Sequence, residues 1–210
     1  PTGAGKSLVI ADIASKLDSP LLIFCPSKEI LEQNFAKLQS YGIFDCGVYS
    51  ASVGCKDINR ITFATIGSVM HHMKDFQHFK YVMVDECHLC NAKGRQYKTF
   101  FEAADRQVIG LTATPYRLER GLNGNSMLKF LTRTRPRIFD EVLYYCQISE
   151  LLAKGYLADW RYFDCTQLDM SNVHTNSTGN DFDENSLKLE YERSGFYDQL
   201  TSTTLRVLKP

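Results

Sequence analysis

A glycine-rich turn with a lysine and a serine directly behind it opens the chain. Gly3-Ala4-Gly5-Lys6-Ser7 precedes apolar residues at helical spacing, which predict a helix over residues 6–17. Glycine lets the backbone approach a phosphate chain closely, and N–H groups at a helix start can converge on it. Lys6 could reach the outer phosphates, and the Ser7 hydroxyl could hold Mg²⁺. The spacing therefore predicts a phosphate-binding loop. The predicted nucleotide contacts are Thr2, Gly3, Ala4, Gly5, Lys6 and Ser7.

Two adjacent carboxylates follow a second apolar segment. The run Tyr81-Val82-Met83-Val84 predicts a buried strand, and it leads into Asp85-Glu86-Cys87-His88. Asp85 could hold the Mg²⁺ shell while Glu86 orients and deprotonates an attacking water. Together with the phosphate-binding loop, this pair predicts hydrolysis of ATP with Mg²⁺ as cofactor. The predicted catalytic residues are Lys6, Asp85 and Glu86, and the predicted metal ligands are Ser7 and Asp85.

A threonine-rich turn ends a further predicted strand. Its sequence is Leu111-Thr112-Ala113-Thr114-Pro115-Tyr116-Arg117. In an open parallel sheet, ligands gather at the carboxyl ends of the strands, so this turn, the loop and the acidic pair are expected on one edge. The two threonine hydroxyls could then hydrogen-bond the acidic segment and report its state.

The elements that must position these residues alternate between strands and helices. Over the first 115 residues this alternation predicts an α/β fold with a mostly parallel sheet covered by helices. Strands are predicted at 20–25, 47–49, 61–64, 81–85 and 107–112. Helices are predicted at 6–17, 27–42, 66–73 and 95–104. Beyond Pro115 we expect a loop at 121–126, a short helix at 149–155, a strand at 160–165, a polar connection at 170–180 and one helix from 186 towards 208.

Composition narrows the class of protein. The 210 residues are 44% hydrophobic and 23% charged, and the longest apolar run is too short for a membrane helix. Seven cysteines without a secretory signal predict reduced thiols in a cytoplasm. Cys87-x-x-Cys90 is half of a zinc pattern that no second pair completes. The net charge is zero, but basic residues gather over 117–137, either as a phosphate-tracking stretch or as a solvated loop.

The three motifs together resemble the helicase superfamily whose second motif is a DEAD or DEAH box. The form here is the DECH variant, and with Thr112 to Arg117 it is most similar to bacterial and phage RadD-type helicases and to the motor subunits of type III restriction enzymes. The resemblance covers about residues 1–165 and implies a RecA-like P-loop core, the first motor core of an ATP-dependent nucleic-acid motor.

The resemblance also implies nucleic-acid contacts. Ser27 and Lys28 match a segment that the family lays against the nucleic-acid backbone, and Thr65 and Ser68 match a second such segment. The alternatives are a helix cap for Ser27 and a buried turn for Thr65. The residues implied in coupling to a partner core are His88, Thr112, Thr114 and Arg117. The expected partner is DNA, with RNA possible.

The family's organisation sets expectations for the whole protein. Family members place a base-reading motif and a strand before the P-loop, and a second RecA-like core supplies an arginine finger. We therefore expect residues 1–132 to form the first core without its N-terminal strand, 133–185 to form a linker, and 186–210 to approach a second core of the same protein. On its own this piece is expected to be inactive and poorly stable, and the protein is expected in a bacterial or phage-infected cytoplasm.

Two other function classes fit parts of the sequence. A P-loop kinase of a small molecule would share the glycine-rich loop, but its chemistry does not require the Asp-Glu-x-His and Thr-Ala-Thr-Pro segments. A catalytically silent nucleic-acid-binding module is disfavoured because Lys6, Asp85 and Glu86 are all intact.

Overall fold

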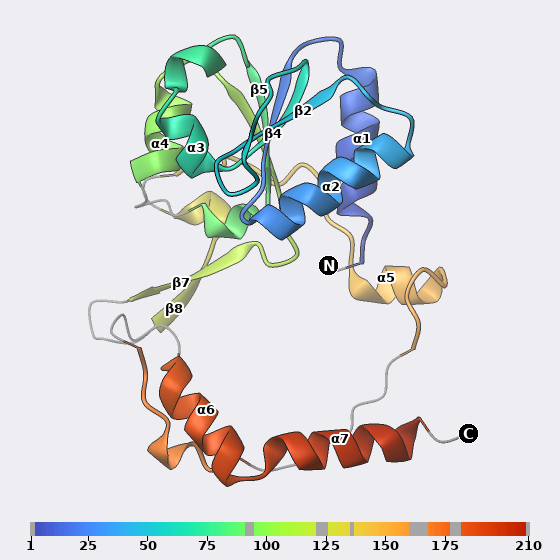
Figure 1. The fold of residues 1–210 in the computed structure, drawn as a ribbon, viewed down its shortest axis with the longest axis vertical. Helices are drawn as coiled ribbons and strands as arrows, with labels where there is room; N and C mark the ends of the chain where they lie inside the picture. Colours follow the sequence, from blue (N-terminus) through green and yellow to red (C-terminus); the bar gives the residue numbers. More distant parts are fainter. Residues whose placement is uncertain are drawn as a thin grey trace. The chain divides into compact units, whose positions relative to one another are not determined.

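The computed structural model describes residues 3–90, 95–120, 126–134, 137–159, 168–176 and 182–208. Within them a six-stranded sheet has the order β3-β2-β4-β1-β5-β6, and β7 and β8 form a separate pair (Figure 1). The strands are β1 (Leu21–Phe24), β2 (Cys46–Ser50), β3 (Cys55–Lys56), β4 (Ile61–Ala64), β5 (Tyr81–Asp85), β6 (Gln107–Leu111), β7 (Tyr116–Arg120) and β8 (Ser126–Phe130). The α-helices are α1 (Lys6–Lys16), α2 (Lys28–Ser40), α3 (Ile66–Met70), α4 (Arg95–Glu102), α5 (Ile148–Ala153), α6 (Glu184–Arg193) and α7 (Phe196–Val207). Short 3₁₀ turns are η1 (Met73–Phe76), η2 (Cys87–Leu89), η3 (Leu131–Arg133) and η4 (Met170–Asn172).

The strand β1 is the centre of the main sheet. It pairs in parallel with β4 on one side and β5 on the other, and β2 and β6 extend the parallel pairing outwards. Only β3 runs antiparallel. All four residues of β1 are buried, as expected for a strand covered on both faces. The predicted mostly parallel sheet flanked by helices is confirmed, and this is the architecture of a RecA-like core.

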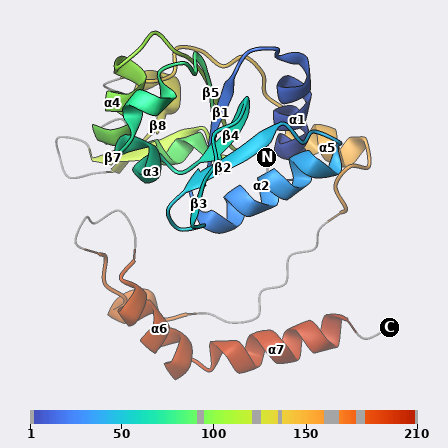
Figure 2. The same cartoon turned by 45° about the horizontal axis from the view of Figure 1, so that its top comes forward.

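Helices cover both faces of the sheet. The helices α1 and α2 lie on one face and α3 and α4 on the other (Figures 1 and 2). Successive side chains of a strand point to opposite faces, so Leu21 and Ile23 join the core under α1 and α2. Leu22 and Phe24 join the core on the other face of the sheet. There the Phe24 ring packs edge to face against Phe100 of α4, with ring centroids 5.2 Å apart.

The parallel register brings the ends of three strands to one level. Phe24 of β1 lies opposite Val84 of β5, and Asp85 lies opposite Leu111 of β6. The segments that follow β1, β5 and β6 therefore leave the sheet at the same edge. That edge is where the sequence motifs were expected to meet.

One helix prediction was wrong, and one pair of strands was not predicted. The single helix expected from residue 186 to 208 is two helices, because Gly195 adopts a left-handed conformation (φ 64°) between α6 and α7. A glycine takes this conformation without the steric cost that other residues meet. The turn after Pro115 leads into the β7–β8 pair, where Tyr116 and Phe130 pack edge to face at 5.1 Å. The loop was expected at 121–126, but Ser126 begins β8. Residues 121–125 and the strand expected at 160–165 lie outside the described residues.

The chain divides into two compact units. The first comprises residues 1–119 and 127–157, and the second comprises 120–126 and 158–210. In the second unit, the Asp183 side chain caps α6, and Tyr191 stacks on Phe196 with ring centroids 4.8 Å apart. The domain boundaries at 132 and 185 stay predictions. In the described part of the chain, no helix is long and apolar enough to cross a membrane.

Gly47 in β2 gives a test of the packing beside the sheet. A Cβ at this position would lie 2.6 Å from the backbone oxygen of Asp57, whose N–H donates to Val48 O at 2.8 Å. We expect Gly47→Ala to lower the free energy of unfolding by about 1–3 kcal/mol, because the backbone of the neighbouring segment must move. Urea unfolding followed by circular dichroism measures this change.

Gly67 in α3 provides the matched control, since a Cβ there meets no atom within 4 Å. Gly67→Ala is expected to leave the free energy of unfolding equal or to raise it by up to about 1 kcal/mol. Equal stability of the Gly47→Ala variant and the native chain would contradict the packing described here.

Candidate nucleotide-binding site

The loop before α1 has the backbone that a phosphate-binding turn requires. Gly3 and Gly5 both adopt left-handed conformations, with φ of 77° and 79°, and Gly5 is the N-cap residue of α1. A Cβ on Gly3 would also lie 3.0 Å from the Leu157 side chain. The first turn of α1 carries no acidic residue, so its N–H groups and Lys6 present only positive character. Of the predicted nucleotide contacts, Thr2 lies outside the described residues.

The acidic pair stands at the end of β5, on the edge that the loop also reaches. Asp85 is buried, with 6% of its surface exposed. Glu86 has a left-handed backbone (φ 49°) and is the one non-glycine residue in the described ranges with a positive φ. Such a conformation is disfavoured for a residue with a Cβ and is typical of functional sites. It turns the Glu86 side chain away from the line of the strand.

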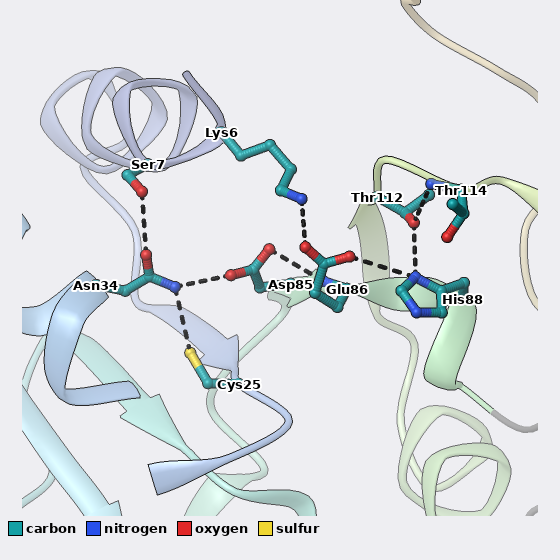
Figure 3. Close-up of polar contacts among 9 residues, drawn as sticks. All are labelled: Lys6, Ser7, Cys25, Asn34, Asp85, Glu86, His88, Thr112 and Thr114. Atoms are coloured by element: carbon teal, nitrogen blue, oxygen red, sulfur yellow. Dashed lines mark hydrogen bonds and ion pairs between the residues drawn. The ribbon is translucent and has the colours of Figure 1, made fainter. Parts of the chain in front are cut away.

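A continuous chain of polar contacts runs from the loop to the threonine turn (Figure 3). The Lys6 ammonium forms an ion pair with Glu86 Oε1. The other Glu86 oxygen lies 3.3 Å from His88 Nδ1, which lies 2.8 Å from Thr112 Oγ1. Thr112 Oγ1 in turn accepts a hydrogen bond from the Thr114 backbone N–H at 3.0 Å. The structure thus brings together five of the predicted site residues, whereas Arg117 lies in β7, outside this chain of contacts.

Asn34 is a residue of the site that the sequence analysis missed. It lies in the middle of α2, is buried, and accepts a hydrogen bond from Ser7 Oγ at 3.1 Å. Its Nδ2 donates to Asp85 Oδ2 at 2.8 Å and lies 3.7 Å from Cys25 Sγ (Figure 3). A signal was present, because Asn34 is a polar residue on the buried face of α2 between Leu31 and Leu38.

The oxygen atoms of Ser7 and Asp85 fit a magnesium ion that binds together with phosphates. Mg²⁺ prefers oxygen ligands and usually keeps several waters, with one or two protein groups and the substrate phosphates completing its shell. The hydroxyl and the carboxylate are held on the same amide side chain, that of Asn34. Among the described residues, no group of three or more His, Cys, Asp or Glu could hold a metal by itself. Ser7 and Asp85 are therefore suited to a metal that arrives with a nucleotide.

A second polar cluster lies where β2 and β4 end. Thr65 and Ser68, predicted to contact nucleic acid, share a hydrogen bond of 2.9 Å, and Ser68 Oγ accepts from the Ala51 backbone N–H at 2.9 Å. Ser50 Oγ, which is fully buried, lies 3.3 Å from Thr65 Oγ1 and 2.9 Å from Ser52 Oγ. The sequence analysis missed Ser50 and Ser52. The cluster is a network of hydroxyls, the groups that hydrogen-bond phosphates without specifying sequence.

The other predicted nucleic-acid contacts, Ser27 and Lys28, lie at the start of α2. Ser27 is the N-cap, and its Oγ accepts from the Ile30 backbone N–H at 3.4 Å. Lys28 lies 3.8 Å from Glu32 in an exposed ion pair, which contributes little to stability. The helix cap that was the alternative for Ser27 is therefore present. The neighbouring Lys28 remains partly exposed.

The cysteines near the site are core residues. Cys25, Cys87 and Cys90 are buried, and burial raises the pKa of the Cys25 and Cys87 thiols to about 12. Burial raises the pKa of Cys90 as well. Zinc binding and nucleophilic attack both require a thiolate, so these thiols act as small apolar side chains at neutral pH.

Relatives of the chain are helicases. "Putative helicase 109L" of Invertebrate iridescent virus 3 is 30% identical over 134 residues, which are 55% of this chain and 38% of the viral protein. "Putative ATP-dependent RNA helicase R290" of Acanthamoeba polyphaga mimivirus is 30% identical over 136 residues, or 54% of this chain and 25% of that protein. The chain thus spans well under half the length of either relative.

Solved structures with a similar arrangement of elements have low sequence identity. The UvsW helicase of bacteriophage T4 gives a TM-score of 0.47 at 22% identity, over 55% of this chain and 45% of that one. A nuclease-deletion mutant of the Type ISP restriction-modification enzyme LlaGI, in complex with a DNA substrate mimic, gives a TM-score of 0.49 at 12% identity, over 74% and 18%.

A family match covers more than half of the chain and spans every motif of the site. The family described as "Type III restriction enzyme, res subunit" matches residues 1–117 of the 210, from the glycine-rich loop to Arg117. The chain belongs to this family.

Proposed function

We propose that this chain binds and hydrolyses MgATP as the first motor core of an ATP-dependent nucleic-acid motor, a helicase or translocase. The observation that carries the proposal is the convergence of Lys6 and Glu86, which come from the loop before α1 and from the end of β5 (Figure 3). A phosphate-binding lysine and a carboxylate base must both reach the terminal phosphate of a nucleotide, and these two side chains meet at one point.

Each site residue has a distinct part in this proposal. The N–H groups of residues 3–7 hold the phosphates, and Lys6 stabilises negative charge on the transferring phosphoryl group. Ser7 and Asp85 hold Mg²⁺, which when bound neutralises charge on the phosphates. Glu86 orients the attacking water and takes its proton. His88 and Thr112 support the second Glu86 oxygen and link the base to the turn after β6.

The nucleic-acid part of the proposal rests on two groups of polar residues. One group is the hydroxyl cluster around Thr65 and Ser68, and the other is the start of α2 at Ser27 and Lys28. Both lie at the carboxyl ends of parallel strands, as the acidic pair does. A backbone-contacting surface on this edge would place the polynucleotide and the ATP site on one rigid sheet. We propose DNA as the polynucleotide of the complete protein, and a second RecA-like core of that protein as the source of an arginine finger.

Replacing the phosphate-binding lysine tests the nucleotide site. Lys6→Ala in the complete protein is expected to abolish ATP hydrolysis and to weaken ATP binding, because the charge on the outer phosphates is lost. Steady-state phosphate release and fluorescent-nucleotide titration measure the two effects. Lys16→Ala, which removes an exposed lysine at the far end of the same helix, is the control. Turnover at the native rate in the Lys6 variant would refute the assignment.

Removing the base separates chemistry from binding. Glu86→Gln is expected to keep MgATP binding and to slow hydrolysis about a hundredfold or more, because the amide cannot accept the proton of the attacking water. Single-turnover hydrolysis alongside equilibrium binding makes the comparison. A native hydrolysis rate would show that Glu86 is not the base. Loss of binding would show that the division of roles between Asp85 and Glu86 is wrong.

Polynucleotide stimulation tests the motor class. We expect DNA to raise the ATPase rate of the complete protein more than RNA does, with an apparent affinity that falls steeply as salt rises. Thr65→Val combined with Ser68→Ala should weaken the stimulation and leave the rate without polynucleotide unchanged. Equal ATPase rates with and without any polynucleotide would favour a small-molecule enzyme, and a stronger response to RNA would overturn the choice of DNA.

A further inference from the structure

Asn34 joins the two predicted magnesium ligands. Its side chain has 7% of its surface exposed and extends from α2 to Ser7 on α1 and to Asp85 at the end of β5 (Figure 3). These three elements have no covalent connection near the site. The Asn34 amide therefore joins α1, which follows the phosphate-binding loop, to the acidic end of β5.

Hydrogen-bond chemistry fixes the orientation of this amide. The Asp85 carboxylate can only accept, so the Asn34 nitrogen must face it, at 2.8 Å. The amide oxygen then faces Ser7 Oγ at 3.1 Å, and an amide oxygen can only accept. The Ser7 hydroxyl must therefore donate its hydrogen to Asn34. This leaves both lone pairs of the Ser7 oxygen for a cation.

The Asp85 carboxylate is held at both of its oxygens. Oδ2 accepts from Asn34 Nδ2, and Oδ1 accepts from the Glu86 backbone N–H at 3.0 Å. The second hydrogen of the Asn34 amide points to Cys25 Sγ at 3.7 Å, where the thiol stays protonated because burial raises its pKa to about 12. Both hydrogens of the amide and its oxygen thus have partners, and the side chain has one orientation that satisfies them.

We infer that Asn34 is a positioning residue for the metal: it directs the Ser7 oxygen and fixes the Asp85 carboxylate so that both are ready to hold Mg²⁺ with a nucleotide. This inference rests on the proposed function. Groups that orient metal ligands typically change metal affinity by about 10–100-fold when they are replaced. Asn34 is expected to act on metal affinity in this way, without touching the reacting phosphate.

Metal binding is the direct test, with Mn²⁺ as the probe in place of Mg²⁺. In the complete protein with a non-hydrolysable ATP analogue, electron paramagnetic resonance measures free and bound Mn²⁺. Asn34→Leu, which removes both amide contacts, is expected to weaken Mn²⁺ binding about tenfold or more. The Mg²⁺ concentration for half-maximal ATPase activity should rise by a similar factor, while the rate at saturating Mg²⁺ changes much less.

Gln39→Leu is the matched control, because it removes an amide from the far end of the same helix. It is expected to bind Mn²⁺ as the native protein does. Affinity for the nucleotide in EDTA and the thermal unfolding midpoint show whether a loss in Asn34→Leu is confined to the metal. A folded Asn34→Leu protein with native Mn²⁺ affinity would overturn the inference.

Asn34→Asp gives a second variant of nearly unchanged shape. At pH 8 it places a second carboxylate against Asp85 in place of the donor, so Mn²⁺ binding should be weaker than in the native protein. Binding at pH 8 equal to or tighter than native would overturn the inference. A native protein that binds no Mn²⁺ with nucleotide would overturn the proposed function as well.

Discussion

The buried carboxylate of Asp85 is the constraint around which the site is arranged. A carboxylate with 6% of its surface exposed is costly unless its oxygens are hydrogen-bonded. Here the partners come from two directions, the Asn34 amide on α2 and the Glu86 backbone N–H. The chain then turns after β5, where Glu86 takes its left-handed conformation. The Glu86 side chain pairs with Lys6. The buried carboxylate and the proposed base thus stand on adjacent residues at one strand end.

The sequence predicted the parts of the site that depend on local pattern. The glycine-rich loop, a helix from Lys6, and acids at the end of a buried strand each follow from neighbouring residues. The common edge also followed, because parallel strands of similar length end together. We also expected the threonine turn to hydrogen-bond the acidic segment, and the structure contains such a contact between His88 and Thr112 at 2.8 Å.

The missed features depend on how distant elements pack. Asn34 could be recognised as a polar residue on a buried face, but its partners are set by the angle at which α2 crosses between α1 and β5. Ser50 was missed for a similar reason, because its contact with Thr65 depends on the pairing of β2 with β4. The break at Gly195 had a local signal, but one glycine does not decide whether a helix bends or ends.

The helix α2 connects the two halves of the proposed function. Its first turn starts at Ser27, directly after β1, on the edge where a polynucleotide is proposed to lie. Two turns later Asn34 holds the carboxylate that is proposed to bind the metal. An α-helix of this length, packed on the sheet through Leu31 and Leu38, moves as one body. A shift at its first turn must therefore reach Asn34 as a displacement or a rotation of the whole helix. Because the amide satisfies Ser7 and Asp85 in one orientation only, such a shift would act on the two proposed metal ligands.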